Sequence, residues 1–235
     1  MLVNILLINI YIYMEKDKYD YLLKYIIIGD SGVGKSNIFL QFIKSTFKSS
    51  HEVTIGVEFG AKNIQLNNTT YRIQIWDTAG QETFKSITRV YYKNSACAFL
   101  VYDITNKDTF YNIQTWMNDC IAQTPQSVIL VLVGNKKDLA NERQVSYEEG
   151  KEFAETHGIR HFFECSAKEN ENIKEAFDSS LNEIDKKIKL KFYDLNSDTC
   201  GVTPFTQKKG ISLSGSAFKS KHTNNNKGGY LNECC

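Results

Sequence analysis

The chain has 235 residues, 42% of them hydrophobic and only two of them proline, which suits one domain core with tails or at most two small domains. A formal net charge of +1 lacks the basic excess that nucleic-acid binding needs, so we expect no nucleic-acid partner. The six cysteines follow neither a metal-binding nor a disulfide-framework spacing, which favours a reducing cytosolic compartment.

Residues 1–20 form an N-terminal extension ahead of the first predicted strand. Residues 1–13 (MLVNILLINIYIY) are apolar, as a signal-peptide core would be, but they lack a basic start and a small-residue cleavage site. Their Ile, Asn and Tyr bias is what upstream AT-rich DNA would encode. We therefore expect Met14 to be the natural start, with residues 1–13 not translated.

A glycine-rich turn between a strand and a helix is the most informative motif of the chain. Residues 21–28 predict a buried strand, and residues 29–36 (GDSGVGKS) fit the phosphate-binding pattern G-x-x-x-x-G-K-[ST]. Apolar residues then recur at helical spacing to about Lys44. Backbone N–H groups and the helix dipole at such a turn surround an anion. The residues expected to bind nucleotide phosphates are Ser31, Gly32, Val33, Gly34, Lys35, Ser36 and Asn37, with the Ser36 hydroxyl a ligand of Mg²⁺.

The remaining elements alternate between strands and helices. A polar loop over 47–56 precedes strands at 57–66 and 70–76, joined by a turn at Asn67-Asn68. Further strands are predicted at 96–102, 128–133 and 161–164, and helices at 105–121, after a Ser146–Glu149 capping box, and at about 172–191. Thr105 or Asn106 is the expected cap of the first of these helices.

This order of elements predicts an α/β fold. We expect a doubly wound, mostly parallel six-stranded sheet with helices on both faces, in one domain over residues 21–193. Each motif follows a strand, and ligands of such sheets sit beyond the carboxyl ends of the strands. From residue 194 to 235 the composition turns to Ser, Asn, Thr, Gly and Lys, which predicts a flexible tail.

The motifs together resemble those of a small GTPase of the Ras superfamily, and within it of a Rab. The superfamily resemblance is carried by GDSGVGKS, Thr54, residues 77–82 (DTAGQE), 135–138 (NKKD) and 165–168 (CSAK). The Rab marks are residues 55–59 (IGVEF), 73–76 (IQIW), 84–88 (FKSIT), Tyr91-Tyr92 and 100–105 (LVYDIT). The stretches LLKYIIIGDSGVGKS, TIGVEFGA and FYDLN resemble the Rab-two subfamily most.

The resemblance implies a P-loop small GTPase fold and a GTP-binding, GTP-hydrolysing switch in vesicle-mediated transport, expected between endoplasmic reticulum and Golgi. One alternative is a nucleotide-dependent binding scaffold with negligible hydrolysis. A P-loop kinase or ATPase is disfavoured, because the chain has no lid or acceptor domain and carries guanine-type loops.

The resemblance also implies which residues bind the guanine base. Asp138 would accept from N1–H and the exocyclic N2 amine, which adenine does not offer in that arrangement. Asn135 would bond N7, the Ala167 N–H would meet O6, and Ser166 is also expected to belong to the nucleotide site. The stems of Lys136 and Lys168 would flank the ring, and Phe47 would stack on the edge of the base.

Hydrolysis is expected to follow the phosphoryl-transfer pattern of the family. Gln81 would orient the attacking water, with Lys35 and Thr54 as the other catalytic residues. Mg²⁺ would be held by Ser36 and Thr54, and by Asp77 through water. The Gly80 N–H would contact the γ-phosphate. No active-site arginine is placed as a finger, so we expect slow intrinsic hydrolysis that a GTPase-activating protein speeds roughly 10³–10⁵-fold.

The resemblance further implies partners and a membrane anchor. Effectors would contact Ile55, Phe59, Trp76 and Tyr91, although Phe59 and Trp76 have the alternative of being core aromatics. Two geranylgeranyl groups on Cys234 and Cys235 would attach the chain to the cytoplasmic face of ER or Golgi membranes, with a cytosolic pool. An exchange factor, a GDP-dissociation inhibitor, a Rab escort protein and a prenyltransferase are the other expected partners.

Two single positions and one short stretch depart from the family pattern. Asn37 stands where Rabs usually carry Cys, Ser or Ala, and Cys165 replaces a commoner Thr. Residues 92–95 (YKNS) also differ from the usual sequence after the first tyrosine, which concerns effector contacts rather than catalysis.

Overall fold

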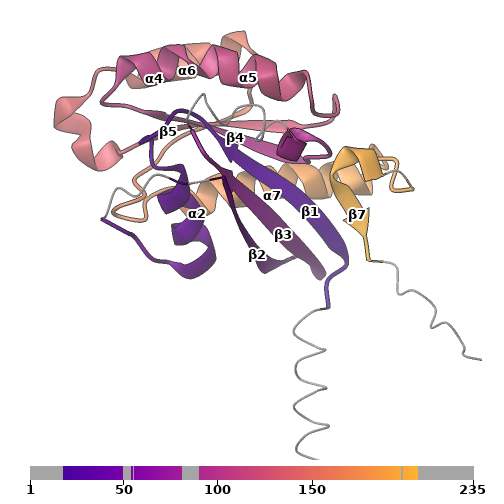
Figure 1. Cartoon of the computed structure of the whole chain (residues 1–235). Helices are drawn as coiled ribbons and strands as arrows, with labels where there is room; N and C mark the ends of the chain where they lie inside the picture. Colours follow the sequence, from indigo (N-terminus) through magenta and orange to yellow (C-terminus); the bar gives the residue numbers. More distant parts are fainter. Residues whose placement is uncertain (1–17, 50–53, 55, 81–89, 197, 206–235) are drawn as a thin grey trace, which may run out of the picture. The chain divides into compact units, whose positions relative to one another are not determined.

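A computed structural model describes residues 18–49, 54, 56–80, 90–196 and 198–205 (Figure 1). The chain divides into two units, Met1–Phe205 and Thr206–Cys235, and all the described residues belong to the first. The expectations for residues 1–13, Ile55, Gln81, Cys234 and Cys235 therefore lie outside the described residues.

Within the described residues, the fold is built on a seven-stranded sheet whose path is β2-β3-β1-β4-β5-β6, with β7 paired to β1 (Figure 1). The strands are β1 (Tyr21–Ile28), β2 (Val57–Leu66), β3 (Thr69–Thr78), β4 (Cys97–Asp103), β5 (Ile129–Asn135), β6 (His161–Glu164) and β7 (Val202–Pro204). β1, β3, β4, β5 and β6 run parallel, whereas β2 is antiparallel to β3 and β7 is antiparallel to β1. The predicted mostly parallel, doubly wound arrangement is confirmed, but the prediction of six strands is wrong, because β7 pairs with β1 as a seventh.

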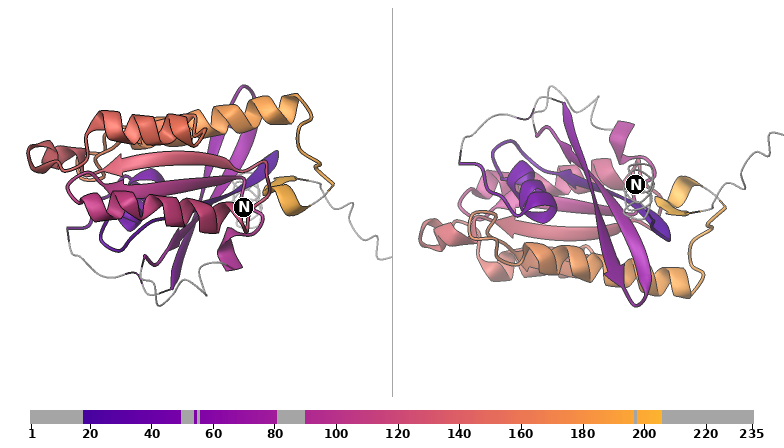
Figure 2. Two further views of the ribbon diagram at one scale, coloured as in Figure 1. Left: turned by 90° about the horizontal axis from the view of Figure 1, so that it is seen from above. Right: turned by 90° about the horizontal axis from the view of Figure 1, so that it is seen from below.

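Helices cover both faces of this sheet (Figures 1 and 2). They are α2 (Lys35–Lys44), α4 (Lys107–Tyr111), α5 (Ile113–Ile121), α6 (Tyr147–Thr156) and α7 (Ile173–Lys189), with 3-10 turns η2 (Lys137–Glu142) and η3 (Asp198–Cys200). α2 and α7 lie on one face and α4, α5 and α6 on the other. No helix within the described ranges is both long and apolar enough to span a bilayer.

The central strand β1 contributes side chains to the hydrophobic cores on both faces of the sheet. Leu23, Tyr25 and Ile27 pack with α2 and α7, whereas Ile26 and Ile28 pack against the opposite helices. Successive side chains of a strand point to opposite faces, so a parallel strand covered on both sides is apolar throughout. The apolar run before the glycine-rich turn therefore fixes that turn rigidly at the carboxyl edge of the sheet.

Local signals placed most element ends correctly. Asn67 and Asn68 both adopt positive φ, 51° and 63°, as a tight hairpin turn requires. Ser146 and Glu149 form the predicted capping box at α6. The predicted helix over 105–121 is instead two helices, α4 and α5, divided at Asn112. Of the two predicted caps, Asn106 is the N-cap of α4, because its side chain accepts a hydrogen bond from the Asp108 N–H.

The segment after α7 differs from the prediction of a tail beginning at residue 194. Residues 198–200 form η3, and β7 pairs with the first residues of β1, Leu23 opposite Val202. β4 begins opposite Tyr25, so the earlier part of β1 has an open edge that β7 fills. Val202 and Cys200 are buried there. The first unit therefore extends to Phe205, twelve residues beyond the predicted boundary; a three-residue strand among polar residues carries too weak a pattern to predict.

Candidate nucleotide-binding site

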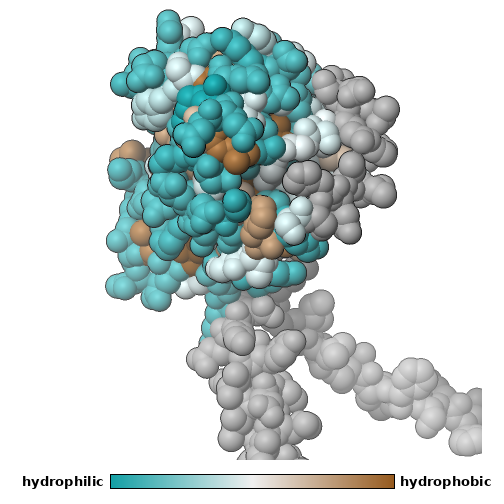
Figure 3. All heavy atoms as spheres, turned by 90° about the vertical axis from the view of Figure 1, so that its left-hand side faces the viewer, coloured by the Kyte–Doolittle hydropathy of each residue, from teal (hydrophilic) through white to brown (hydrophobic). Residues whose placement is uncertain are grey.

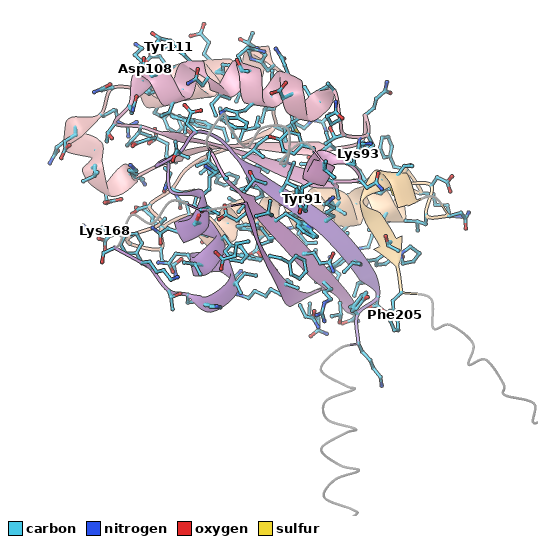
Figure 4. The ribbon with its side chains drawn as sticks, in the orientation of Figure 1. Tyr91, Lys93, Asp108, Tyr111, Lys168 and Phe205 are labelled. Atoms are coloured by element: carbon cyan, nitrogen blue, oxygen red, sulfur yellow. The ribbon has the colours of Figure 1, made fainter. Side chains whose placement is uncertain are left out.

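A pocket of about 680 Å³ lies where the loops after β1, β3, β5 and β6 converge. Its lining residues are Ser31, Gly32, Gly34, Lys35, Ser36, Asn37, Leu40, Phe47, Lys48, Thr54, Val57, Glu58, Gly80, Asn135, Lys136, Asp138, Leu139, Ala167 and Lys168. The size suits a small-molecule ligand such as a nucleotide. The side of the molecule on which Lys168 lies in Figure 4 faces the viewer in Figure 3, and it is mostly hydrophilic.

The phosphate loop occupies the turn from β1 into α2. Gly34 has a φ of 96° in the left-handed region, and a Cβ there would collide with the Asn135 side chain. The Lys35 ammonium is buried in the loop and donates to the carbonyl oxygens of Gly29 (2.9 Å) and Asp30 (2.6 Å). Burial lowers the pKa of Lys35 to about 8, so it stays mainly protonated at neutral pH and can pair with phosphate oxygens.

The residues expected to hold Mg²⁺ come together beside this loop. The Ser36 and Thr54 hydroxyl oxygens lie 2.8 Å apart. Asp77, at the end of β3, is fully buried, and neither of its carboxylate oxygens has a hydrogen-bond partner within the described part of the chain. Burial raises the pKa of Asp77 to about 6, against the opposing effects of the nearby Ser36 hydroxyl and, to a smaller extent, of the Lys35 charge.

This donor set fits a hard divalent cation. Two hydroxyls and a nearby carboxylate are oxygen donors of the kind that Mg²⁺ takes together with water and phosphate oxygens. A hydrated cation would also give the two orphaned Asp77 oxygens the partners that buried polar atoms normally have. The described residues hold no cluster of three or more His, Cys, Asp or Glu that could bind a metal ion.

Gly80 brings the loop after β3 into contact with the phosphate loop. A Cβ at Gly80 would collide with the backbone of Asp30 and Ser31. The backbone of Gly80 therefore lies so close to the phosphate loop that no side chain would fit between them. That the Gly80 N–H contacts a terminal phosphate stays a prediction.

Asn135, the last residue of β5, links two of the binding loops. Its Nδ2 donates to the Val33 carbonyl (2.8 Å), and its Oδ1 accepts from the Ala167 N–H (3.1 Å). The Ala167 N–H, which was expected to meet O6 of the base, therefore has Asn135 as its partner in this structure. A side-chain amide has a second N–H, which is free of these two contacts and available to N7 of a base. The structure thus brings the phosphate loop, β5 and the loop over 165–168 into one rigid unit.

Asp138 and Ser166 form the second part of the base region. The Ser166 hydroxyl donates to Asp138 Oδ1 (2.7 Å) and accepts from the Glu169 N–H (3.0 Å). The Lys168 ammonium lies 4.0 Å from Asp138 Oδ2. Ser166 is fully buried and does not line the pocket. It therefore orients the carboxylate, whereas the sequence alone suggested a direct place in the nucleotide site.

Two supporting residues escaped the sequence analysis. Asp103, at the end of β4, pairs with the Lys136 ammonium at 2.6 Å and so fixes the lysine whose stem borders the pocket. Asp30 in the phosphate loop accepts from Trp116 Nε1 and from Asn112 Nδ2, both at 2.7 Å. Trp116 lies 86 residues away along the chain, so no local pattern could have indicated this pair.

The residues predicted to bind the nucleotide or Mg²⁺, or to take part in catalysis, fall into three groups: those that line the pocket, those buried behind it, and Gln81. Most predicted binding residues line the pocket, while Val33, Ser166 and Asp77 lie buried behind it. Leu40, Lys48, Val57, Glu58 and Leu139 line the pocket without having been predicted. Gln81 lies outside the described residues.

An aromatic patch lies next to the pocket loops. The ring centroids of Phe59 and Trp76 are 4.9 Å apart, and those of Trp76 and Tyr91 are 5.0 Å apart (Figure 4 labels Tyr91). Phe59 is 49% exposed, which rules out its being an ordinary core residue. Trp76 is partly buried and packs against the core that includes residues of α5. It therefore belongs both to the aromatic patch and to the edge of this core.

The comparison with known families agrees with this geometry. The model of the Ras family matches residues 24–186, which is more than half of the chain. The match includes the phosphate loop, Thr54, Asp77, Gly80 and the two base loops. Every residue that lines the pocket lies within the matched span, and the chain is a member of the Ras family.

Proposed function

We propose that the chain is a Rab-type switch that controls vesicle-mediated transport between endoplasmic reticulum and Golgi. The aromatic patch of Phe59, Trp76 and Tyr91 is the observation that carries this proposal. It is partly exposed and begins one residue after Glu58, which lines the pocket. An effector bound on this surface would sense the loops that respond to the nucleotide.

The switch depends on contacts that only the triphosphate offers. Thr54 would ligate Mg²⁺ and Gly80 would donate its N–H to the γ-phosphate. Both residues already border the phosphate loop, through the Ser36–Thr54 hydroxyl contact and the close approach of Gly80 to Asp30. Loss of the γ-phosphate would remove both interactions at once and let the two loops reorganise.

Hydrolysis is proposed to be slow without an activator. Bound Mg²⁺ would neutralise charge on the phosphates, Lys35 would pair with them, and Gln81 would orient the attacking water. Single-turnover GTP hydrolysis with and without a Rab GTPase-activating protein tests this. We expect a stimulation of roughly 10³–10⁵-fold. No hydrolysis in either condition would favour the alternative, a nucleotide-dependent scaffold.

The Rab assignment is tested by prenylation. The full chain is incubated with Rab escort protein, the Rab prenyltransferase and geranylgeranyl diphosphate, and its mass is measured. We expect two added groups, and none on a chain that ends at Glu233. A matched control, Cys200→Ser, keeps the terminal pair and removes a buried thiol, so it should still gain two groups. A full chain that gains no group would overturn the proposal.

A further inference from the structure

The side chain of Asn37 makes a two-bond clamp on the backbone of Lys48. Asn37 Nδ2 donates to the Lys48 carbonyl at 3.1 Å, and Asn37 Oδ1 accepts from the Lys48 N–H at 2.9 Å. A carboxamide presents a donor and an acceptor side by side, which matches the carbonyl and N–H of one residue. Cys, Ser or Ala at this position could not span the same pair of groups.

The clamp joins two parts of the nucleotide pocket. Asn37 lies in the first turn of α2, directly after Ser36, and Lys48 follows Phe47. Asn37, Phe47 and Lys48 all line the pocket. The segment over 46–49 has no regular secondary structure, and Phe47 is 39% exposed. The two hydrogen bonds from Asn37 therefore hold the irregular segment 46–49, which lines one side of the pocket, against the rigid phosphate loop.

We propose that Asn37 is a positioning residue that slows nucleotide release. By fixing the Lys48 backbone it keeps the neighbouring Phe47 ring at the mouth of the pocket, where the ring covers the bound base. This inference rests on the proposed guanine-nucleotide function, and it adds a residue whose side chain departs from the family pattern. Asn37 acts through Phe47 and has no part in the chemistry of hydrolysis.

The alternative is that the clamp only adds to folding stability. Both bonds lie at an exposed site, and each hydrogen bond of this kind makes a modest net contribution. A purely structural contribution would change the unfolding temperature and leave the release rate of bound nucleotide unchanged. A positioning role would change the release rate, and the change would depend on Phe47. The two roles are therefore separable by kinetics.

The test measures dissociation of a fluorescent GDP analogue from the full chain, with excess unlabelled GDP and saturating Mg²⁺. Asn37→Ala and Asn37→Ser should both release the analogue roughly 5- to 30-fold faster than the unsubstituted chain, as expected for the loss of two modest hydrogen bonds. Asn182→Ala is the matched control, because that exposed amide on α7 donates within its own helix. Its release rate should equal that of the unsubstituted chain.

A double-mutant cycle with Phe47→Ala decides whether the effect passes through the ring. Phe47→Ala alone should speed release, and adding Asn37→Ala should then change the rate less than twofold. Equal effects of Asn37→Ala in both backgrounds would overturn the proposal, as would an Asn37→Ala rate equal to that of the unsubstituted chain. If the unsubstituted chain retained no GDP, the proposed function itself would fail, a result distinct from these.

Discussion

The Asp138 carboxylate is the group expected to distinguish guanine from adenine. The Ser166 hydroxyl donates to its Oδ1, which fixes the carboxylate in orientation. Guanine offers an N1–H and an N2 amine to such a carboxylate, whereas an amide at the same place would prefer a carbonyl at C2.

Asp138→Asn should therefore lower GTP affinity by roughly 10- to 100-fold, since hydrogen bonds to a charged group are lost, and should raise affinity for xanthosine triphosphate. Equilibrium binding of both nucleotides measures the change. Asp178→Asn, on the exposed side of α7 where Asp178 pairs with Lys174, is the matched control. Unaltered GTP affinity in Asp138→Asn would contradict the assignment.

Asp77 predicts a pH effect in the protein without metal or nucleotide. Its folded-state pKa is raised from 3.8 to about 6, because burial disfavours the ionised form. A raised carboxyl pKa contributes stability below pH 4, and this contribution is lost as pH rises through about 6. Asp77→Asn abolishes the titration, so its unfolding temperature should exceed that of the unsubstituted chain increasingly between pH 4.5 and 7.

Thermal unfolding of both chains across that pH range measures the difference in their unfolding free energies. This difference is expected to be on the order of a few kcal/mol at neutral pH. With Mg²⁺ and GDP the order should reverse, because the ionised carboxylate then has its partner. Parallel pH curves for the two chains would show that Asp77 does not titrate in this window.

At the scale of elements, α5 supports the phosphate loop through one indole. Trp116 Nε1 donates to Asp30 Oδ1, and removing the donor leaves a half-buried, charged acceptor with one partner fewer. Trp116→Phe keeps most of the ring, so we expect a loss of roughly 1–3 kcal/mol in unfolding free energy. Trp76→Phe is the control, because Trp76 Nε1 has no hydrogen-bond partner among the described residues. Equal losses in urea unfolding would contradict the role given to Asp30.

The same contact marks the limit of what the sequence could predict. The phosphate loop, the Asn67-Asn68 turn and the Ser146 cap are set by neighbours within a few residues, and their patterns are strong. The Asp30–Trp116 pair and the Asn37–Lys48 clamp depend on how separate segments meet in space. β7 depends on where β4 happens to begin, which no pattern within residues 194–205 encodes.

At the scale of the whole molecule, β7 should be part of the folded unit. A chain ending at Tyr193 exposes the early edge of β1 and loses the buried Val202 side chain. We expect it to be less stable by roughly 2–4 kcal/mol, or about 5–15 °C in unfolding temperature. A chain ending at Phe205 is the control and should unfold at the temperature of the full chain. Identical unfolding of both truncated chains would show that β7 adds no stability.

β7 also determines which part of the domain a pulling force on the C-terminal residues would act on first. The Phe205 N–H bonds the Asp20 carbonyl at 2.8 Å, so the last described residue lies beside the beginning of β1. In the proposed membrane-anchored state, tension along residues 206–235 would bear on the β7–β1 pairing before it reached α7. If that pairing opened under load, residues 194–205 would lengthen the tether by up to about 40 Å while the nucleotide pocket, at the opposite end of β1, stayed intact.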